Sequence, residues 1–363
     1  MRILQICSAS SIGGGERHIA DLSNSLADRG HEVLFAVRPD SPFVSLLTNV
    51  DRANVCRAEM RNAVGLISAS KIAGFARRNH VDIIHAHIAR DYPIAALASR
   101  LSGIPFVLTR HVLFPMKRLQ RFVLHKVSAV IAPSTAVYRS LVDEAVIPVG
   151  KTVLIHNGIE TGRFNAVPHT GARPFLVGTI GHLGKIKGHD IFVRAAAIVA
   201  KQKPEVQFVI IGDDKSRGGR DRVELIRSIA ELEMGSTIKL IEWTDNIPAQ
   251  LAQMDIFISA ARSEPFGLAI CEAMAAGVPV IATASEGAKE IIEHKVSGRL
   301  LTSLEPEELA LAIMALADDE GERKKLGANG SRRILDQFSL PQMVDKTETL
   351  YQSVVKRVRQ TAI

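Results

Sequence analysis

The stretch 263–282 constrains the fold of this chain more than any other, because a complete strand–loop–helix–strand pattern surrounds it. The apolar run 254–259 predicts a short buried strand that leads into the loop. Residues 268–276 favour a helix that ends at Gly277, and 278–282 predicts the next buried strand. Such a βαβ unit has a right-handed crossover and belongs to a parallel sheet, whose ligands bind outside the carboxyl ends of the strands.

Two carboxylates and a helix start share this loop. Glu264 follows the first predicted strand, at the edge where a ligand is expected. The backbone N–H groups of Phe266, Gly267 and Leu268 point out of the helix start, where the helix dipole favours an anion such as a diphosphate. Glu272 lies one turn after Leu268 on the same helix face. Its carboxylate can accept hydrogen bonds there from two neighbouring hydroxyls, as on a ribose.

Alternating apolar runs and helical stretches occur twice along the chain. The predicted strands are 2–7, 32–37, 82–87, 105–109 and 128–132 in the first half, and 175–180, 206–211, 237–241, 254–259 and 278–282 in the second. This pattern predicts an α/β protein with two doubly wound domains, and 363 residues suit two hydrophobic cores. A Pro- and Gly-containing linker at 167–174 separates them, and 343–358 is a candidate amphipathic helix.

Composition narrows the class of protein. With 47% hydrophobic and 23% charged residues, the chain is typical of soluble globular proteins. Cys7, Cys56 and Cys271 suit neither a metal site nor a disulfide framework, so we expect a reducing cytoplasm. No signal peptide is recognised, and no apolar stretch approaches the ~20 residues of a membrane-spanning helix. The net charge of +7 suits anionic substrates or membranes, and without basic–aromatic interleaving we expect no nucleic-acid partner.

The pair Glu264 and Glu272 forms an E-x7-E pattern that encloses Pro-Phe-Gly-Leu and is closed by Glu-Ala-Met-Ala-Ala-Gly-Val-Pro-Val. This pattern resembles that of the retaining GT-B glycosyltransferases of the group 4 family, also described as glycosyl transferases group 1. The resemblance implies two Rossmann-like doubly wound domains that face each other across a cleft. It also implies that Glu264 contacts the transferred sugar and Glu272 the ribose of the donor. The plainer interpretation is two solvated carboxylates beside an ordinary helix.

The same resemblance assigns the domains. Residues 1–167 would form the acceptor-side domain, completed by a crossing helix at 343–363, and 174–342 would form the nucleotide-sugar domain. Gly14 and Gly15 match the family's Gly-Gly-x-Glu loop, which faces the donor phosphates and the acceptor. A plain strand-to-helix turn explains these glycines as well.

Three histidines end two of the predicted strands in the first half. His111 matches the family's Thr-x-His motif and is implied to lie near the donor sugar. His85 and His87 are expected to line the acceptor side. For each of them the alternative is a packed, hydrogen-bonded imidazole with no contact to substrate.

In the second half, 181–188 matches the family's Gly-Arg-Leu-x-x-x-Lys-Gly loop, whose Arg and Lys clamp the diphosphate. Lys187 matches, but His182 stands where Arg is usual, and a neutral imidazole is a weaker anion ligand than a guanidinium. Either the phosphate keeps His182 protonated, or Lys187 and Lys185 hold more of the charge. Trp243 belongs to the loop that the family places against the nucleobase, and it packs either on the base or on the core.

Together these features predict a metal-independent, retaining glycosyltransferase without a cofactor. Glu264, His111 and Lys187 are the candidate catalytic residues. The remaining candidates for donor binding are Gly14, Gly15, His182, Trp243, Phe266, Gly267, Leu268 and Glu272. The expected partners are a nucleotide-sugar and a glycan, small-molecule or lipid-linked acceptor. A GT-B epimerase or phosphorylase, or an inactive sugar-nucleotide-binding protein, is the alternative.

The segment 113–126 is amphipathic after Pro115. Lys117, Arg118 and Arg121 give it a basic face, and Leu119, Phe122 and Val123 give it an apolar one. Such a helix either binds the anionic inner face of a membrane or packs its apolar face on the domain. The expected location is therefore the cytoplasm, with attachment to the inner membrane face as one outcome.

Overall fold

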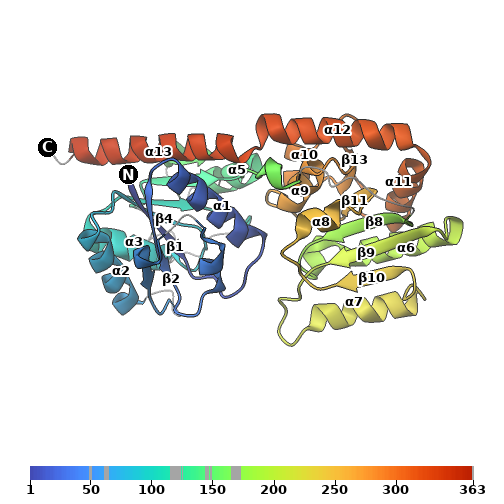
Figure 1. Ribbon diagram of the computed structural model, residues 1–363, viewed down its shortest axis with the longest axis horizontal. Helices are drawn as coiled ribbons and strands as arrows, with labels where there is room; N and C mark the ends of the chain where they lie inside the picture. The colour runs from blue at the N-terminus through green and yellow to red at the C-terminus, as the bar shows by residue number, and fades with distance from the viewer. Residues whose placement is uncertain are drawn as a thin grey trace. The chain divides into compact units, whose positions relative to one another are not determined.

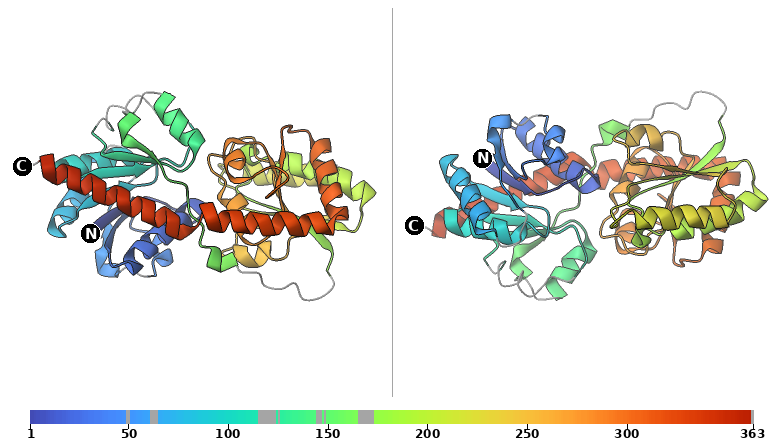
Figure 2. Two further views of the ribbon diagram at one scale, coloured as in Figure 1. Left: turned by 90° about the horizontal axis from the view of Figure 1, so that it is seen from above. Right: turned by 90° about the horizontal axis from the view of Figure 1, so that it is seen from below.

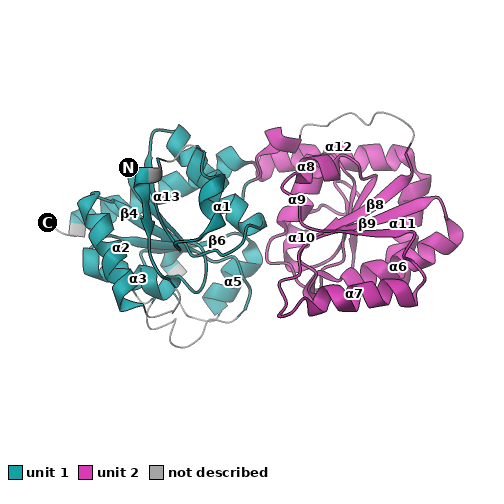
Figure 3. Cartoon of the chain, turned by 60° about the horizontal axis from the view of Figure 1, so that its bottom comes forward, with its two compact units in different colours: residues 1–158, 340–363 teal, residues 159–339 magenta. Residues whose placement is uncertain are grey.

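A computed structural model describes residues 1–48, 51–60, 65–114, 124, 126–143, 147, 149–164 and 173–361 of the chain. It divides the chain into two compact units, Met1–Gly158 with Leu340–Ile363, and Ile159–Ser339 (Figure 3). The division lies before the linker expected at 167–174. The reason is that the Ile159 N–H donates to the carbonyl of Phe338 at 2.8 Å, which ties the chain to the second unit directly after Gly158.

The first unit contains a seven-stranded sheet in which every neighbouring pair is parallel. Its strands are β1 (Arg2–Cys7), β2 (Glu32–Val37), β3 (Val55–Arg57), β4 (Ile83–Ala86), β5 (Phe106–Thr109), β6 (Ala129–Ala132) and β7 (Thr152–Leu154), in the order β3-β2-β1-β4-β5-β6-β7. Its helices are α1 (Gly14–Asp28), α2 (Leu66–Arg78), α3 (Tyr92–Ser102), α5 (Thr135–Asp143) and α13 (Leu340–Thr361). Short 3-10 helices are η1 (Pro42–Leu46), η2 (Arg52–Asn54) and η3 (Val149–Lys151).

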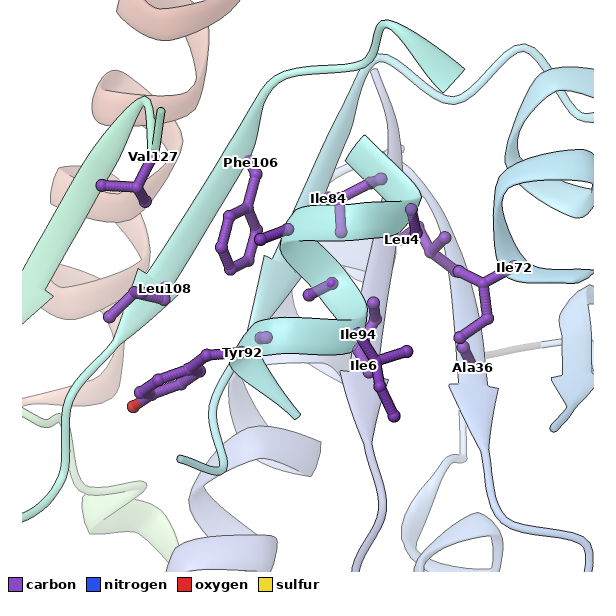
Figure 4. Packing of buried hydrophobic residues seen from close by; sticks show 14 of the residues in the cluster. Leu4, Ile6, Ala36, Ile72, Ile84, Tyr92, Ile94, Phe106, Leu108 and Val127 are labelled. Carbon is purple, nitrogen blue, oxygen red and sulfur yellow. The ribbon is translucent and has the colours of Figure 1, made fainter. Parts of the chain in front are cut away.

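Apolar side chains on both faces of this sheet form the core, as expected for buried parallel strands. On one face Leu4, Ile6 and Ile84 pack against α2 and α3, with Ile72 and Ile94 among their partners (Figure 4). On the other face the sheet packs against α1 and α13. The last helix thus completes the core of the first unit, and it lies along that unit in both views of Figure 2.

The second unit contains a six-stranded sheet, again with every neighbouring pair parallel (Figure 1). Its strands are β8 (Phe175–Ile180), β9 (Val206–Ile211), β10 (Ile238–Ile241), β11 (Ile256–Ser259), β12 (Val280–Thr283) and β13 (Arg299–Leu301), in the order β10-β9-β8-β11-β12-β13. Its helices are α6 (His189–Gln202), α7 (Arg220–Glu231), α8 (Ile247–Leu251), α9 (Leu268–Ala275), α10 (Glu286–Ile291), α11 (Pro306–Asp318) and α12 (Glu320–Gln337), with 3-10 helices η4 (Thr161–Phe164) and η5 (Lys185–Lys187).

Two apolar clusters cover the two faces of this sheet. One joins the sheet to α6, α7 and α11, and the other joins it to α8, α9, α10 and α12. The doubly wound architecture predicted for both halves is confirmed, since helices cover both faces of each parallel sheet. No helix of the described chain is long and apolar enough to cross a membrane.

Candidate functional site

Each sheet has one point at which the strand order reverses. In the first sheet it lies between β1 and β4, and in the second between β8 and β11. In open α/β sheets, ligands bind outside the carboxyl ends of the strands at this point. The loops that follow β8 and β11, together with α9 (Leu268–Ala275), carry most of the predicted donor residues, so sheet topology and sequence motifs indicate the same place in the second unit.

The loop after β8 fits closely against the end of β11. Gly188 has a φ of +69°, and a Cβ atom there would lie 1.9 Å from the carbonyl oxygen of Ala260. No side chain fits in this position, so glycine is required for the two loops to pass each other. The short helix η5 precedes Gly188 and thereby brings Lys187 to the loop that carries Glu264.

Lys187 and Glu264 form an ion pair at the reversal point, with Nζ donating to Oε2. The side chains are 27% and 14% exposed, so the pair is partly shielded from water. Lys185, two residues earlier, instead pairs with Glu224 at 3.0 Å and is 76% exposed. Of the two lysines in this loop, only Lys187 points to the predicted sugar carboxylate.

The loop after Glu264 leads into α9 through Gly267, which has a φ of +113°. No side chain caps the start of α9, so N–H groups of its first turn are available to an anion. The backbone N–H of Gly287 donates to the carbonyl of Glu264 at 2.8 Å and holds the loop. Glu272 is partly buried on the same helix and has a partner within the protein.

The side chain of Phe266 packs into the core, so only the backbone of this residue belongs to the surface of the loop. Its ring is 3% exposed and meets Phe338 edge to face, with 5.9 Å between the ring centroids. Leu268 is partly buried and packs against the same apolar cluster. Both residues therefore hold the start of α9 on the core of the second unit.

His182 is a neutral imidazole in this environment. Burial, followed by the nearby charges of Lys215 and Lys187, lowers its pKa to about 4. Its Nδ1 atom is buried without a hydrogen-bond partner within the described residues. His182 thus offers an uncharged ring where the family pattern has arginine, and Lys187 is the cation of this loop that contacts Glu264.

Trp243 follows β10 and packs against the cluster that contains α9. Its backbone N–H donates to Oδ1 of Asp213 at 3.2 Å. The indole Nε1 is buried and has no partner among the described residues. The ring thus forms part of the core, with one donor left unused.

In the first unit, α1 begins at Gly14, after the extended residue Gly13. Gly15 is exposed, and a Cβ atom there would meet no atom within 4 Å, so the fold of this unit does not require glycine at that position. His111 follows β5 and lies 5.5 Å from His18 of α1, measured between ring centroids. Burial lowers the pKa of His111 to about 4, so its ring is neutral at pH 7.

His85 and His87 do not line an acceptor surface, and that expectation is wrong. His85 is fully buried, and it hydrogen-bonds Tyr351 of α13 at 2.5 Å and Thr109 at 2.8 Å. His87 is 2% exposed and hydrogen-bonds Gln5 at 2.9 Å. These two rings are packed imidazoles that join the strands to each other and to α13.

The structure brings Lys187, Glu264 and the start of α9 together, with His182 on the same loop as Lys187. Gly14, Gly15 and His111 belong to the first unit. Among the described residues, no three His, Cys, Asp or Glu side chains are grouped as a metal site would require. The amphipathic segment predicted at 113–126 lies mostly outside the described residues, which include 113, 114, 124 and 126.

Sequence comparison identifies both halves of the chain. The family described as "Glycosyl transferases group 1" matches residues 165–333, and "Glycosyltransferase Family 4" matches residues 12–163. The chain belongs to the group 1 glycosyltransferases of GT-B fold.

Curated relatives and solved structures agree with this glycosyltransferase family. N-acetyl-alpha-D-glucosaminyl L-malate synthase of Bacillus anthracis is 26% identical, over 95% of both chains. The lipopolysaccharide core biosynthesis glycosyltransferase LpsE of Rhizobium meliloti is also 26% identical, over 92% of this chain and 94% of that one. Anabaena HepE in complex with UDP and glucose superposes with a TM-score of 0.85 at 26% identity, covering 96% of this chain and 99% of that one.

Sequence reasoning missed a second polar group in this glycosyltransferase. Ser8, Arg90 and Asp91 meet at the reversal point of the first sheet, although Ser8 is far from the others in sequence. Nothing in the local pattern marks them, because their meeting depends on β1 and β4 being neighbours.

Proposed function

We propose that this glycosyltransferase moves a sugar from a nucleotide-sugar donor to an acceptor, with retention of the anomeric configuration and without a bound metal ion. The contact between Lys187 and Glu264, at the reversal point of the second sheet, is the observation that carries this proposal. It joins a phosphate-binding cation to a carboxylate that is suited to a sugar.

The donor diphosphate would lie between Lys187 and the uncapped start of α9. Both supply positive potential, and a departing nucleoside diphosphate develops negative charge as the glycosidic bond breaks. In this proposal, Lys187 and the N–H groups of α9 take the role that a metal ion has in other enzymes. His182 adds a neutral ring that can donate or accept a hydrogen bond.

Glu264 would orient the transferred sugar and stabilise the positive charge that develops at its anomeric carbon. Glu272, one turn into α9, would accept hydrogen bonds from the ribose hydroxyls. For a retaining reaction on one face of the sugar, the leaving phosphate oxygen would accept the proton of the acceptor hydroxyl. Glu264 then acts through charge and position, and not as a nucleophile.

The solved relatives suggest which donor should be tested first. Structures of HepE contain UDP with glucose, and UDP-glucose, which supports a UDP-sugar as the first donor to test. The names of curated relatives include L-malate, inositol 3-phosphate and the lipopolysaccharide core, so they leave the acceptor open among quite different molecules.

The test compares the two lysines of the loop after β8. Lys187→Met should weaken binding of the donor about tenfold or more, because a charge-assisted hydrogen bond to phosphate is lost. Lys185→Met is the matched control, since its exposed ion pair with Glu224 contributes little. Equal donor affinity in both variants would exclude Lys187 from the donor site.

The carboxylates are tested by kinetics. Glu264→Gln should lower kcat roughly 100-fold with little change in donor KM, since that side chain acts on charge in the transition state. Glu272→Ala should mainly raise donor KM, because its contacts exist in the ground state as well. Proton NMR of the first product formed would give the anomeric configuration, and an inverted product would reject the retaining mechanism.

A further inference from the structure

Arg90 is held in a fixed position at the reversal point of the first sheet. It lies in the turn between β4 and α3, and its guanidinium reaches the residue that follows β1. Nε donates to Oγ of Ser8 and Nη2 donates to the carbonyl oxygen of Ser8, both at 2.8 Å. Ser8 is fully buried, and its own N–H donates to Oδ2 of the buried Asp91 at 2.9 Å. The arginine is thus anchored on a buried part of the unit.

The anchoring leaves part of the guanidinium unused. A guanidinium has several N–H donors in a planar fork, and within the described residues those on Nη1 of Arg90 have no partner. Arg90 forms no ion pair with any described carboxylate. A solvated surface arginine is usually mobile, whereas this one is exposed at its free end and fixed at the other. A fixed fork of this kind suits a carboxylate or a phosphate.

Other arginines follow the neighbouring strands at the same edge. Arg38 follows β2, and its side chain makes no hydrogen bond or ion pair with the described residues; Arg57 ends β3. Arg110 follows β5 and is 3% exposed. The carboxylate of Asp91 is buried and engaged by Ser8. Asp91 and Glu16 also lie near the end of β1, so the charge offered to an incoming anion comes from the exposed guanidinium of Arg90 and not from the edge as a whole.

The histidines at this edge do not supply that charge. Burial lowers the pKa of His111 to about 4 and keeps the pKa of His87 well below its ordinary value. Both rings are therefore neutral at pH 7. An anion that reaches this edge finds its cationic partner in Arg90, which is both exposed and held in place.

We propose that Arg90 binds an anionic group of the acceptor, a carboxylate or a phosphate, outside the carboxyl ends of β1 and β4. The role as acceptor site rests on the proposed function, whereas the anion subsite itself rests on the geometry of Ser8 and Arg90. It narrows the acceptor class to acidic molecules such as hydroxy acids and sugar or polyol phosphates.

Calorimetric titration of the full chain tests the subsite with three matched probes: glucose, glucuronate and glucose 6-phosphate. UDP-glucose is titrated separately. The variants are Arg90→Gln, Arg90→Lys and the control Arg100→Gln, which removes an exposed arginine from the last turn of α3. In the wild type, at least one anionic sugar should bind more tightly than glucose, and the tighter of the two identifies phosphate or carboxylate as the preferred group.

Arg90→Gln should weaken binding of that anionic sugar about tenfold or more, and leave the affinity for UDP-glucose unchanged. Arg90→Lys should keep only part of the wild-type affinity for that anionic sugar, and Arg100→Gln should keep all of it. The proposal is overturned if glucose binds as tightly as both anionic sugars, if neither anionic sugar binds, or if Arg90→Gln weakens UDP-glucose instead. Failure of the wild type to bind UDP-glucose, with anion binding still lost in Arg90→Gln, would reject the donor assignment and support the subsite.

Discussion

Acidification to pH 5 should destabilise the first unit strongly, because it contains four neutral histidines, His18, His85, His87 and His111, and burial lowers the pKa of His111 to about 4. Burial lowers the pKa of His18 and His85 to about 3, and keeps that of His87 well below its ordinary 6.5. In the unfolded chain the same side chains protonate as the pH falls below 6.5. The unfolded state then binds more protons than the folded one, so stability present above pH 6.5 is lost on acidification.

The size of the effect follows from that difference. Each pH unit below 6.5 shifts the balance by about 1.4 kcal/mol for each histidine that stays neutral in the fold. Going from pH 7 to pH 5 therefore costs about 2 kcal/mol for each of the four histidines, or about 8 kcal/mol together.

Asp91 partly offsets this loss of stability. Burial raises its pKa from 3.8 to about 6, so the folded state takes up this proton before the unfolded state does. At pH 5 the proton on Asp91 restores about 1 kcal/mol of stability, and the net loss is about 7 kcal/mol. That is comparable with the whole free energy of unfolding of a typical domain.

Equilibrium urea unfolding at pH 7 and pH 5 measures this change, with two probes. Far-UV circular dichroism reports both units, and fluorescence of the chain's single tryptophan, Trp243, reports the second. The second unit has two such histidines, His182 and His189, and burial lowers the pKa of each to about 4. We therefore expect the fluorescence transition to lose about 4 kcal/mol of unfolding free energy, and the first unit to lose more.

Two variants separate this cause from general acid sensitivity. His18→Gln should remove about 2 kcal/mol of the pH dependence, because a buried titrating group is lost. His80→Asn removes an exposed histidine and should leave the pH dependence as it is. Equal unfolding free energies at the two pH values, or full pH dependence in His18→Gln, would refute the reasoning.

Three further outcomes are expected. Gly188→Ala should destabilise the second unit by ~2 kcal/mol or more in urea unfolding, because the added Cβ would overlap a backbone carbonyl, and wild-type stability in this variant would contradict the prediction. Gly15→Ala should instead leave stability unchanged and weaken donor binding. Transfer should persist in EDTA, and complete loss with recovery on adding Mg²⁺ or Mn²⁺ would reject metal independence. Anionic vesicles should sediment the wild type in a salt-sensitive manner and release the Lys117/Arg118/Arg121→Glu variant, and an unbound wild type at low salt would exclude attachment through 113–126.

The strands were predictable because buried parallel strands leave continuous apolar runs in the sequence. The run 206–211 coincides with β9, and 175–180 coincides with β8. By contrast, β3, β7 and β13 were not predicted. Each is an edge strand of only three residues, too short to leave a clear apolar run in the sequence. In addition, β3 ends in the charged Arg57.

The candidate site was predictable only where its parts are close in sequence. Glu264, Gly267 and Glu272 could be placed on one loop and one helix from local pattern alone. The contact of Lys187 with Glu264 could not, because it depends on β8 and β11 being neighbours. The interior position of His85 depends on Tyr351 of the last helix, which no local motif connects to β4.

The two reversal points hold their cations in different ways, and the difference bears on how each would meet a ligand. Lys187 is neutralised by Glu264, so a diphosphate that binds Lys187 must replace this carboxylate as its partner. That exchange would free Glu264 for the sugar at the moment the donor arrives, and it keeps both side chains ordered before then. Arg90 is held by the uncharged oxygens of Ser8, which fix its direction, and it forms no ion pair with a described carboxylate, although the buried Asp91 interacts with its charge. An anion can therefore bind Arg90 without displacing a carboxylate from an ion pair.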